Sequence, residues 1–295
     1  MDTYTEKYSR WFDVNRIPYI IVDNVLWREY NKMVVPVGPV SKSYSLSIDD
    51  AKALLKRFPQ SMLCRWTSPP KNDFSESGFY AVVCKSFVPH ENLPSKRRNE
   101  ILRGISHCIV RQIDAETMQK QGYDVYCKAT RHYNASPVSI EQFSGEFILH
   151  KGFEDIIHYW GVFFDDVLVA YAKVLVYGRE EANVTVAKFD PDFHKYYPSY
   201  ALFYAINEMY LKQSGFHYVN DGFKSLHHQT NIQDFLIRKF GYEKFYVDLF
   251  LKYRTGWNSA IKFTSPFRTL MKRIHPGTSA LYAMNDIVKH QNSVK

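Results

Sequence analysis

Residues 184–248 read VTVAKFDPDFHKYYPSYALFYAINEMYLKQSGFHYVNDGFKSLHHQTNIQDFLIRKFGYEKFYVD, and this stretch decides the fold. A strand through Val184 leads to a helix that Pro198 opens, because proline suits the first helical turn. Apolar residues then recur at helical spacing until Gly215, which can take the positive φ that ends a helix. The stretch therefore begins as a strand, a loop and a helix.

The second half of the stretch repeats that order. A short strand over 216–220 ends at Asp221-Gly222, and a helix begins at Thr230-Asn231 and stops before Gly241. Residues 242–253 alternate in character, which predicts one long strand. Because each helix connects neighbouring strands, we expect these strands to share one sheet.

The residues before this stretch predict antiparallel strands. Residues 156–164 and 167–177 form a hairpin about Asp165-Asp166, and a further turn leads into the strand from Val184. We expect a helix over 139–151 ahead of the hairpin, with its apolar residues on one face. Three antiparallel strands thus precede the helix that Pro198 opens.

The N-terminal half has weaker sequence signals for where helices and strands begin and end. We expect helices over 47–57 and 96–106, the second of them rich in Lys and Arg. A short helix over 114–121 is expected to end at Gly122, and residues 123–130 are expected to be extended.

Two segments resemble a known family. The order of elements, and especially TNIQDFLIRKFGYEKFYV at 230–247, resembles the last third of GNAT-type N-acyltransferases. The segment PSYALFYAINEMYLKQSGFHYVNDG at 198–222 resembles the FemABX-like branch, as does LPSKRRNEILRGISHCIVRQI at 93–113. The resemblance covers residues 156–253 best.

The resemblance implies an α/β (α+β) fold, with a GNAT-like, mixed but mainly antiparallel sheet flanked by helices and two pseudo-repeated lobes. We expect a degenerate N-terminal lobe over 1–136, an acyltransferase lobe over 137–253 and a basic C-terminal extension over 254–295. Ser136-Pro137 marks the boundary between the lobes. The two halves share no obvious sequence repeat, so their relation rests on analogy.

The positive net charge favours an anionic partner but does not identify which one. The chain has 295 residues, 45% of them hydrophobic, and a formal net charge of +8, which fits a globular protein with an anionic partner. CoA, tRNA, an acidic carrier protein and an anionic lipid surface all remain open. We expect a cytoplasmic protein with no secretory signal and no membrane-spanning run. The four cysteines are expected to be buried free thiols.

The resemblance implies transfer of an acyl or aminoacyl group from acyl-CoA, another activated acyl donor, an acyl carrier protein or aminoacyl-tRNA to an amine acceptor. Proton transfer in such a reaction needs a group that titrates near neutrality or a carboxylate. The candidate catalytic residues are Asp221, His227, His228 and His194. The candidates for holding the donor are Tyr197, Ser199, Tyr200, Lys224 and Asn231. Turn formation, helix capping and plain exposure are the structural interpretations of the same residues.

The sequence departs from the family at two places. The glycines that bring backbone N–H groups to a CoA pyrophosphate are absent before the helix, and Pro198 has no N–H. The position of a tyrosine general acid is Ile237, which cannot donate a proton. These departures favour donors other than free CoA. They also keep open a non-catalytic binding module and a nucleic-acid-binding protein that uses the basic helix at 96–103. The histidine spacing matches no closed zinc pattern, so no metal is expected.

Overall fold

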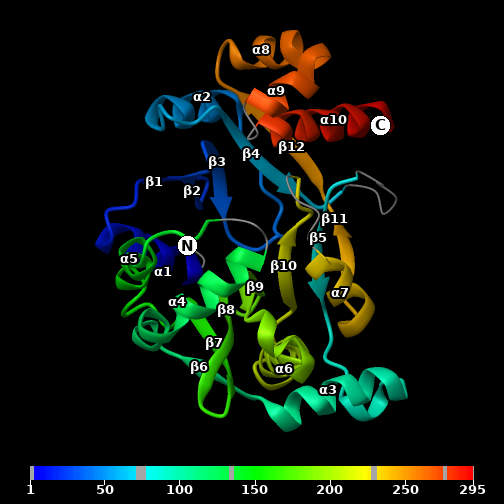
Figure 1. The fold of residues 1–295 in the computed structure, drawn as a ribbon. Helices are drawn as coiled ribbons and strands as arrows, with labels where there is room; N and C mark the ends of the chain where they lie inside the picture. The colour runs from blue at the N-terminus through cyan, green and yellow to red at the C-terminus, as the bar shows by residue number, and fades with distance from the viewer. Residues whose placement is uncertain (1–2, 71–77, 133–135, 227–230, 275–277, 295) are drawn as a thin grey trace. The chain divides into compact units, whose positions relative to one another are not determined.

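The structure is a computed structural model that describes residues 3–70, 78–132, 136–226, 231–274 and 278–294 (Figure 1). The chain divides into two compact units. The first unit comprises Met1–Val82, Phe223–Gln233 and Lys244–Lys295. The second unit comprises Val83–Gly222 and Asp234–Glu243.

The first unit contains a five-stranded sheet in the order β1-β2-β3-β4-β12. Its strands are β1 (Tyr19–Val22), β2 (Val25–Tyr30), β3 (Met33–Val37), β4 (Leu63–Ser68) and β12 (Asp248–Tyr253). Its helices are α1 (Thr3–Val14), α2 (Ile48–Arg57), α8 (Trp257–Thr264), η4 (Ser265–Phe267), α9 (Arg268–Ile274) and α10 (Thr278–Val294). The predicted start of α2 is confirmed, because Ser47 accepts a hydrogen bond from Asp50 N as an N-cap does.

The other sheet has seven strands in the order β11-β5-β10-β9-β8-β7-β6, and β5, β10 and β11 contain residues of both units. Its strands are β5 (Tyr80–Cys84), β6 (Ile109–Ile113), β7 (Ile157–Phe164), β8 (Val167–Tyr177), β9 (Glu181–Phe189), β10 (Tyr218–Phe223) and β11 (Glu243–Tyr246). The remaining helical elements are η1 (His90–Asn92), α3 (Ser95–His107), α4 (Ala115–His132), α5 (Ile140–Ile148), η2 (Pro191–Tyr196), α6 (Pro198–Asn207), η3 (Glu208–Gln213) and α7 (Asn231–Phe240). Two sheets flanked by helices confirm the predicted mixed α/β class.

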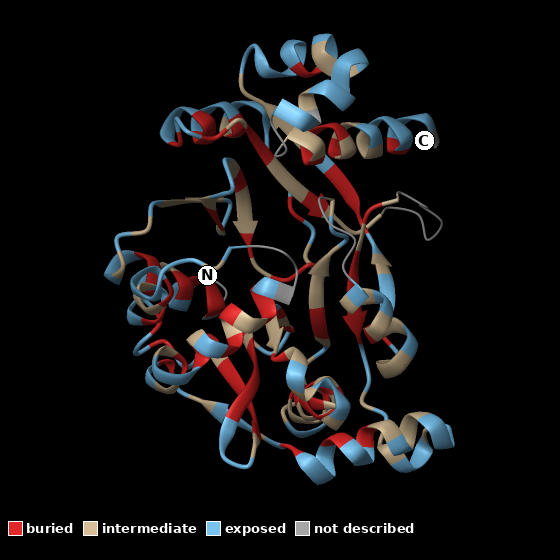
Figure 2. Cartoon of the chain, viewed as in Figure 1, coloured by how far each residue is buried: buried red, intermediate tan, exposed pale blue. Residues whose placement is uncertain are grey.

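Helices cover both faces of the sheet in the second unit, and its central strands are largely buried (Figure 2). Lys188 of β9 lies 6.0 Å from the ring of Tyr126 in α4, whereas the next residue, Phe189, lies 6.4 Å from Phe203 in α6. Successive side chains of a strand point to opposite faces, so α4 and α6 cover opposite faces of β9.

The predicted hairpin and the predicted helix from Pro198 are both confirmed. Strands β7, β8 and β9 pair antiparallel, and Asp165 and Asp166 turn the hairpin with φ of 46° and 61°. Helix α6 begins at Pro198 and continues into the π-helical η3, and Gly215 follows with φ of 66°. The π-helical turn means that the last part of the predicted helix is wider than an α-helix.

The predicted helix end at Gly122 is wrong. Helix α4 runs without a break through Gly122, so residues 123–130 are helical rather than extended. A Cβ at Gly122 would lie 2.6 Å from Met118 Cε and 3.1 Å from Phe143 Cζ. This glycine therefore allows α5 to pack closely on α4, and it does not end the helix.

The predicted single strand over 242–253 is also wrong. It is two strands, since β11 ends at Tyr246 and β12 begins at Asp248 in the other sheet. Val247 between them is fully buried, and its N–H donates to the carbonyl of Phe79. Asp221-Gly222 lies within β10 rather than after it, with Gly222 at φ of 82°.

The compact units do not follow the predicted lobes over 1–136, 137–253 and 254–295. Residues 83–136 belong with residues 137–222, because α4 packs on β8 and β9. Contacts within a fold do not decide whether two halves descend from one repeat. The pseudo-repeated lobes therefore stay a prediction.

Candidate functional site

The second unit contains an opening in its sheet between β9 and β10. The two strands run parallel and pair at only three positions, the last of which joins Asn220 to Asn183. Strand β9 continues to Phe189, and beyond Asn183 it pairs with β8 alone among the described strands. Alternate N–H and C=O groups of β9 point away from β8, so those beyond Asn183 have no ladder partner in β10. The opening therefore presents backbone donors to whatever enters it.

A β-bulge lies at the same place. Lys173 of β8 pairs with Val186, and Val174 pairs with Val184, which leaves Thr185 as an extra residue in β9. The hydroxyl of Thr185 donates to the carbonyl of Lys173 at 3.3 Å. Bulges bend a strand and often lie beside active sites, where they redirect backbone groups. Here the bulge bends β9 just beyond its last pair with β10.

Buried polar side chains lie at the point where β9 and β10 separate. Asn220 Nδ2 donates to Glu181 Oε1 at 2.9 Å, and Asn220 Oδ1 accepts from Gly222 N at 2.6 Å. Both Asn220 and Glu181 are fully buried. Asn183 Oδ1 is also buried, and it has no hydrogen-bond partner among the described residues. A buried acceptor without a donor is costly, so Asn183 Oδ1 is a candidate to accept a hydrogen bond from a water molecule or a ligand.

The start of α6 differs from an open anion-binding helix end. Tyr197 has a left-handed backbone with φ of 60°, and Pro198 supplies no N–H. The N–H groups of Tyr200 and Ala201 both donate to the carbonyl of Tyr197, at 3.0 and 3.3 Å. Ser199 is thus the one residue of the first turn whose N–H has no bond to another described residue. The backbone here cannot wrap a pyrophosphate as a glycine loop does.

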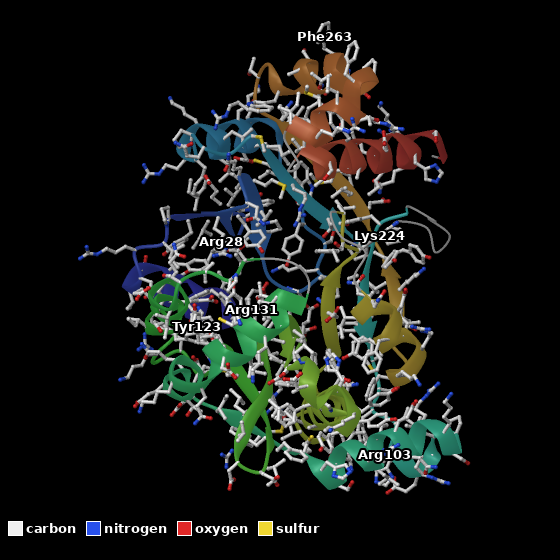
Figure 3. The ribbon with its side chains drawn as sticks, viewed as in Figure 1. Arg28, Arg103, Tyr123, Arg131, Lys224 and Phe263 are labelled. Carbon is white, nitrogen blue, oxygen red and sulfur yellow. The ribbon has the colours of Figure 1, made fainter. Side chains whose placement is uncertain are left out.

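Cationic side chains from other elements surround this helix start. Arg103 of α3 lies 4.8 Å from the ring of Tyr197 and pairs with no carboxylate in the described part of the chain (Figure 3). Lys239 of α7 lies 5.6 Å from the ring of Tyr200 and pairs with Glu100 at 2.7 Å. Burial raises the pKa of Tyr200. Arg103 is therefore one of the cations available to an anionic ligand at this helix start.

The predicted site residues divide between the units. Tyr197, Ser199 and Tyr200 lie together at the start of α6, and His194 is exposed on η2 just before it. Asp221 lies in β10 directly after the point of separation, and its charge adds to burial in raising the pKa of Tyr242.

The other predicted residues do not join that group within one unit. Lys224 and Asn231 belong to the first unit, and Lys224 Nζ donates to the carbonyl of Gly78 at 3.2 Å. His227 and His228 lie outside the described residues. The roles of all these residues stay predictions.

Sequence reasoning missed Asn183, Asn220, Glu181 and Lys239, and it placed Arg103 only in a basic helix. One signal pointed to α3. Gly104 stands in the middle of a helical pattern, where glycine is unfavourable unless another backbone comes close.

Cys64, Cys84 and Cys108 are poor candidates for a nucleophile at this opening. All four are buried, and burial raises the pKa of Cys64 to about 12 and that of Cys84 and Cys108 to about 11. A thiol with such a pKa is protonated at neutral pH and therefore unreactive. Within the described ranges no group of three or more His, Cys, Asp or Glu side chains could hold a metal ion.

Lys188 is half-buried on β9 beyond the opening, and burial lowers its pKa. We expect Lys188→Met to raise the free energy of unfolding by roughly 0.5 kcal/mol near neutral pH, because methionine fills similar space without a charge. The folded-state pKa is lowered, so the penalty is full below it and disappears as the pH approaches about 10.4, the ordinary lysine value. Urea unfolding at several pH values should show the advantage of the variant shrinking as pH rises. An advantage that grows with pH would contradict this account.

A different hollow, of about 330 Å³, lies in the first unit. It is lined by α2, α10 and β12, with the rings of Trp66 and Phe250 stacked 5.7 Å apart beside Lys252. Its volume suits a small ligand. Its neighbouring strands β4 and β12 pair along their whole length, so this hollow lacks the exposed backbone found between β9 and β10.

Comparison with solved structures supports the same architecture. FemX matches with a TM-score of 0.54 at 8% identity, over 87% of this chain and 92% of that chain. A conserved protein of unknown function from Bacteroides thetaiotaomicron VPI-5482 matches with a TM-score of 0.51 at 14% identity, over 85% and 90%. The chain has the FemX fold. At such low identity the likeness establishes the fold alone.

A weaker likeness is to a tandem GNAT protein from the clavulanic acid biosynthesis pathway, with a TM-score of 0.46 at 10% identity over 78% of each chain. No protein-family model matches the sequence, and no curated protein matches it. Among the described helices, none combines the length and hydropathy needed to cross a bilayer.

Proposed function

We propose that this protein is an N-acyltransferase, which moves an acyl or aminoacyl group from a thioester or aminoacyl-tRNA donor to a primary amine. The observation that carries the proposal is the opening between β9 and β10, where pairing stops at Asn183 and Asn220 and a bulge follows at Thr185. Backbone N–H groups without a ladder partner suit the oxygen of a carbonyl that becomes an oxyanion. The FemX fold is consistent with this chemistry.

The reaction balances with the groups near the opening. The amine nitrogen bonds to the carbonyl carbon, and the C–S bond of a thioester, or the C–O bond of an aminoacyl ester, breaks. The amine loses a proton, and the thiol or hydroxyl leaves with one. Asp221, directly after the last paired residue, is the proposed proton acceptor, and His194 is the alternative. In this proposal Asn183 Oδ1 accepts a hydrogen bond from the bound substrate.

The donor is expected to be held by cationic side chains more than by backbone. Pro198 and the two N–H groups already bonded to Tyr197 leave little backbone for a pyrophosphate. Arg103 supplies positive charge to either a CoA or a tRNA phosphate, and the other basic residues of α3 add to it. An acyl carrier protein is a further donor to test.

Thermal unfolding with acetyl-CoA, long-chain acyl-CoA, free CoA, acyl carrier protein and aminoacyl-tRNA tests the donor class. A ligand at a hundredfold excess over its dissociation constant stabilises the native state by about 2.7 kcal/mol. Transfer is then measured with the stabilising donor and a panel of primary amines. Binding of a tRNA donor should weaken steeply with salt, because phosphate contacts release counterions. No binding and no transfer with any of these donors would contradict the proposal.

Arg103→Ala is expected to weaken donor binding roughly tenfold, because the variant loses a charged contact to phosphate. The matched control is Arg111→Ala, since Arg111 also lies over an aromatic ring, that of Phe163 at 4.3 Å. Isothermal titration with the stabilising donor measures both. Equal losses in the two variants would remove Arg103 from the donor site.

A non-catalytic binding module is the second candidate, favoured by Pro198 and by Ile237 in place of a proton donor. It predicts ligand binding without turnover. Turnover that disappears in Asp221→Ala, while the thermal unfolding of the variant is unchanged, would exclude it.

A further inference from the structure

Large apolar side chains are exposed along the helical segment formed by α8, η4 and α9. We name them the Phe263 face, and Figure 2 shows how exposed this segment is. The members, with their exposed fractions, are Trp257 (39%), Phe263 (77%), Phe267 (58%), Leu270 (53%) and Ile274 (54%). Exposed apolar clusters of this kind mark interaction surfaces.

Four of these side chains have the spacing of one helical face, and Trp257 stands outside that repeat at the start of α8. Phe263, Phe267, Leu270 and Ile274 stand at i, i+4, i+7 and i+11, the repeat that keeps residues on one helical face. Ile261 is buried in the apolar core of the first unit, and Met271 packs against the same core. The segment therefore anchors itself by one apolar side and leaves a second one exposed. Phe263 points away from the rest of its unit (Figure 3).

The sequence of the segment that carries the Phe263 face contains positive charge only. Between Asp248 and Asp286 the sequence contains no Asp or Glu, and its basic residues are Lys252, Arg254, Lys262, Arg268, Lys272 and Arg273. Lys262 and Arg273 are exposed beside the apolar stripe, and Arg268 pairs with Asp286 at 3.3 Å. The surface thus combines apolar tips with two exposed cations, Lys262 and Arg273, that form no ion pair with another described residue.

We propose that the Phe263 face docks on the surface of an anionic lipid bilayer. Phenylalanine, leucine, isoleucine and tryptophan tips can enter the boundary between headgroups and acyl chains, while Lys and Arg reach the lipid phosphates. The rings of Trp257, Phe263 and Phe267 could also stack on bases, but the aliphatic tips of Leu270 and Ile274 favour acyl chains over RNA. The charge complementarity is with an anionic surface, so a neutral bilayer is expected to bind less.

Vesicle flotation of the full chain tests the proposal. Vesicles of phosphatidylcholine mixed with phosphatidylglycerol are expected to carry the protein up the gradient, and vesicles of phosphatidylcholine alone are expected to carry much less. The double variant Phe263→Ser, Phe267→Ser is expected to bind the anionic vesicles at least roughly tenfold more weakly, because two apolar tips no longer leave water. Each of Lys262→Gln and Arg273→Gln should lower binding roughly fivefold.

The matched control is Ile148→Ser, Val167→Ser, which removes two side chains of similar exposure, 67% and 58%, from the second unit. It is expected to bind anionic vesicles as the wild type does. All variants replace exposed side chains, so unchanged thermal unfolding confirms that they are folded. Failure of the wild type to float with anionic vesicles would overturn the proposal. An equal loss of vesicle binding in the control variant would also overturn it. So would a wild type that is a dimer and binds no vesicles, if only the Phe263, Phe267 variant is a monomer.

The test is independent of the acyl-transfer proposal. Vesicle binding needs no donor and no turnover, and transfer to a soluble amine can be measured without vesicles. Each proposal can therefore fail while the other stands.

Discussion

Replacing Gly104 with alanine is expected to lower the free energy of unfolding by about 1–3 kcal/mol. A Cβ at this position of α3 would lie 2.7 Å from the carbonyl oxygen of Tyr197 and 3.0 Å from the backbone nitrogen of Ala201. Neither backbone atom can rotate aside as a side chain does, so α3 must move away from α6. Alanine favours the helical state by up to about 1 kcal/mol over glycine, and the expected loss is what remains after that gain.

Urea unfolding of Gly104→Ala and Gly145→Ala measures the effect against a matched control. Gly145 also lies inside a helix, α5, but a Cβ there would meet nothing within 4 Å. Gly145→Ala is therefore expected to stabilise the protein by about 0.5–1 kcal/mol. A stabilising Gly104→Ala would show that α3 does not press on the start of α6. If the donor binds beside Arg103, Gly104→Ala should also weaken donor binding.

Glycines explain much of what the sequence could and could not predict. Gly215 and Gly241 end their helices with positive φ, as their positions after apolar runs indicated. Gly122 has the same appearance in the sequence, yet it lies inside α4 against Met118. Whether a glycine ends a helix or admits a neighbour depends on the partner element, and a single sequence does not show that partner.

Strand pairing was likewise predictable only where the partner strand is adjacent in the chain. Local alternation predicted the hairpin of β7 and β8, because its partner strand is adjacent in the chain. The residues of β11 and β12 alternate as one strand, but their partners are β5 and β4, which come from distant parts of the chain. Periodicity reports which side chains share a face, and it carries no information on which strand lies alongside.

The candidate site was predictable in outline only. Tyr197, Ser199 and Tyr200, which the resemblance implied as donor-binding residues, lie together at the start of α6, and the predicted strand through Val184 is the one that separates from β10. The burial of Glu181, of Asn220 and of the Oδ1 atom of Asn183 was not predictable, because polar residues in a strand usually face water.

Asn220→Ala is the second substitution with a large expected effect, a loss of about 2–4 kcal/mol in the free energy of unfolding. Asn220 serves two buried groups at once, since it donates to Glu181 Oε1 and accepts from Gly222 N. Alanine removes both bonds and leaves a fully buried carboxylate with one donor fewer. Because the last β9–β10 pair joins Asn220 to Asn183, the same change should loosen the opening and lower acyl transfer as well.

A double-mutant cycle with Glu181→Ala separates the bond from the rest of the loss. The two side chains lie in direct contact, so the double variant should lose less than the sum of the single variants, with a coupling of at least about 1 kcal/mol. Asn99→Ala, on the exposed side of α3, is the control and should change stability by less than about 0.5 kcal/mol. Additive losses for Asn220 and Glu181 would mean that their hydrogen bond does not hold the point where the strands separate. The origin of the opening would then lie in the bulge at Thr185 alone.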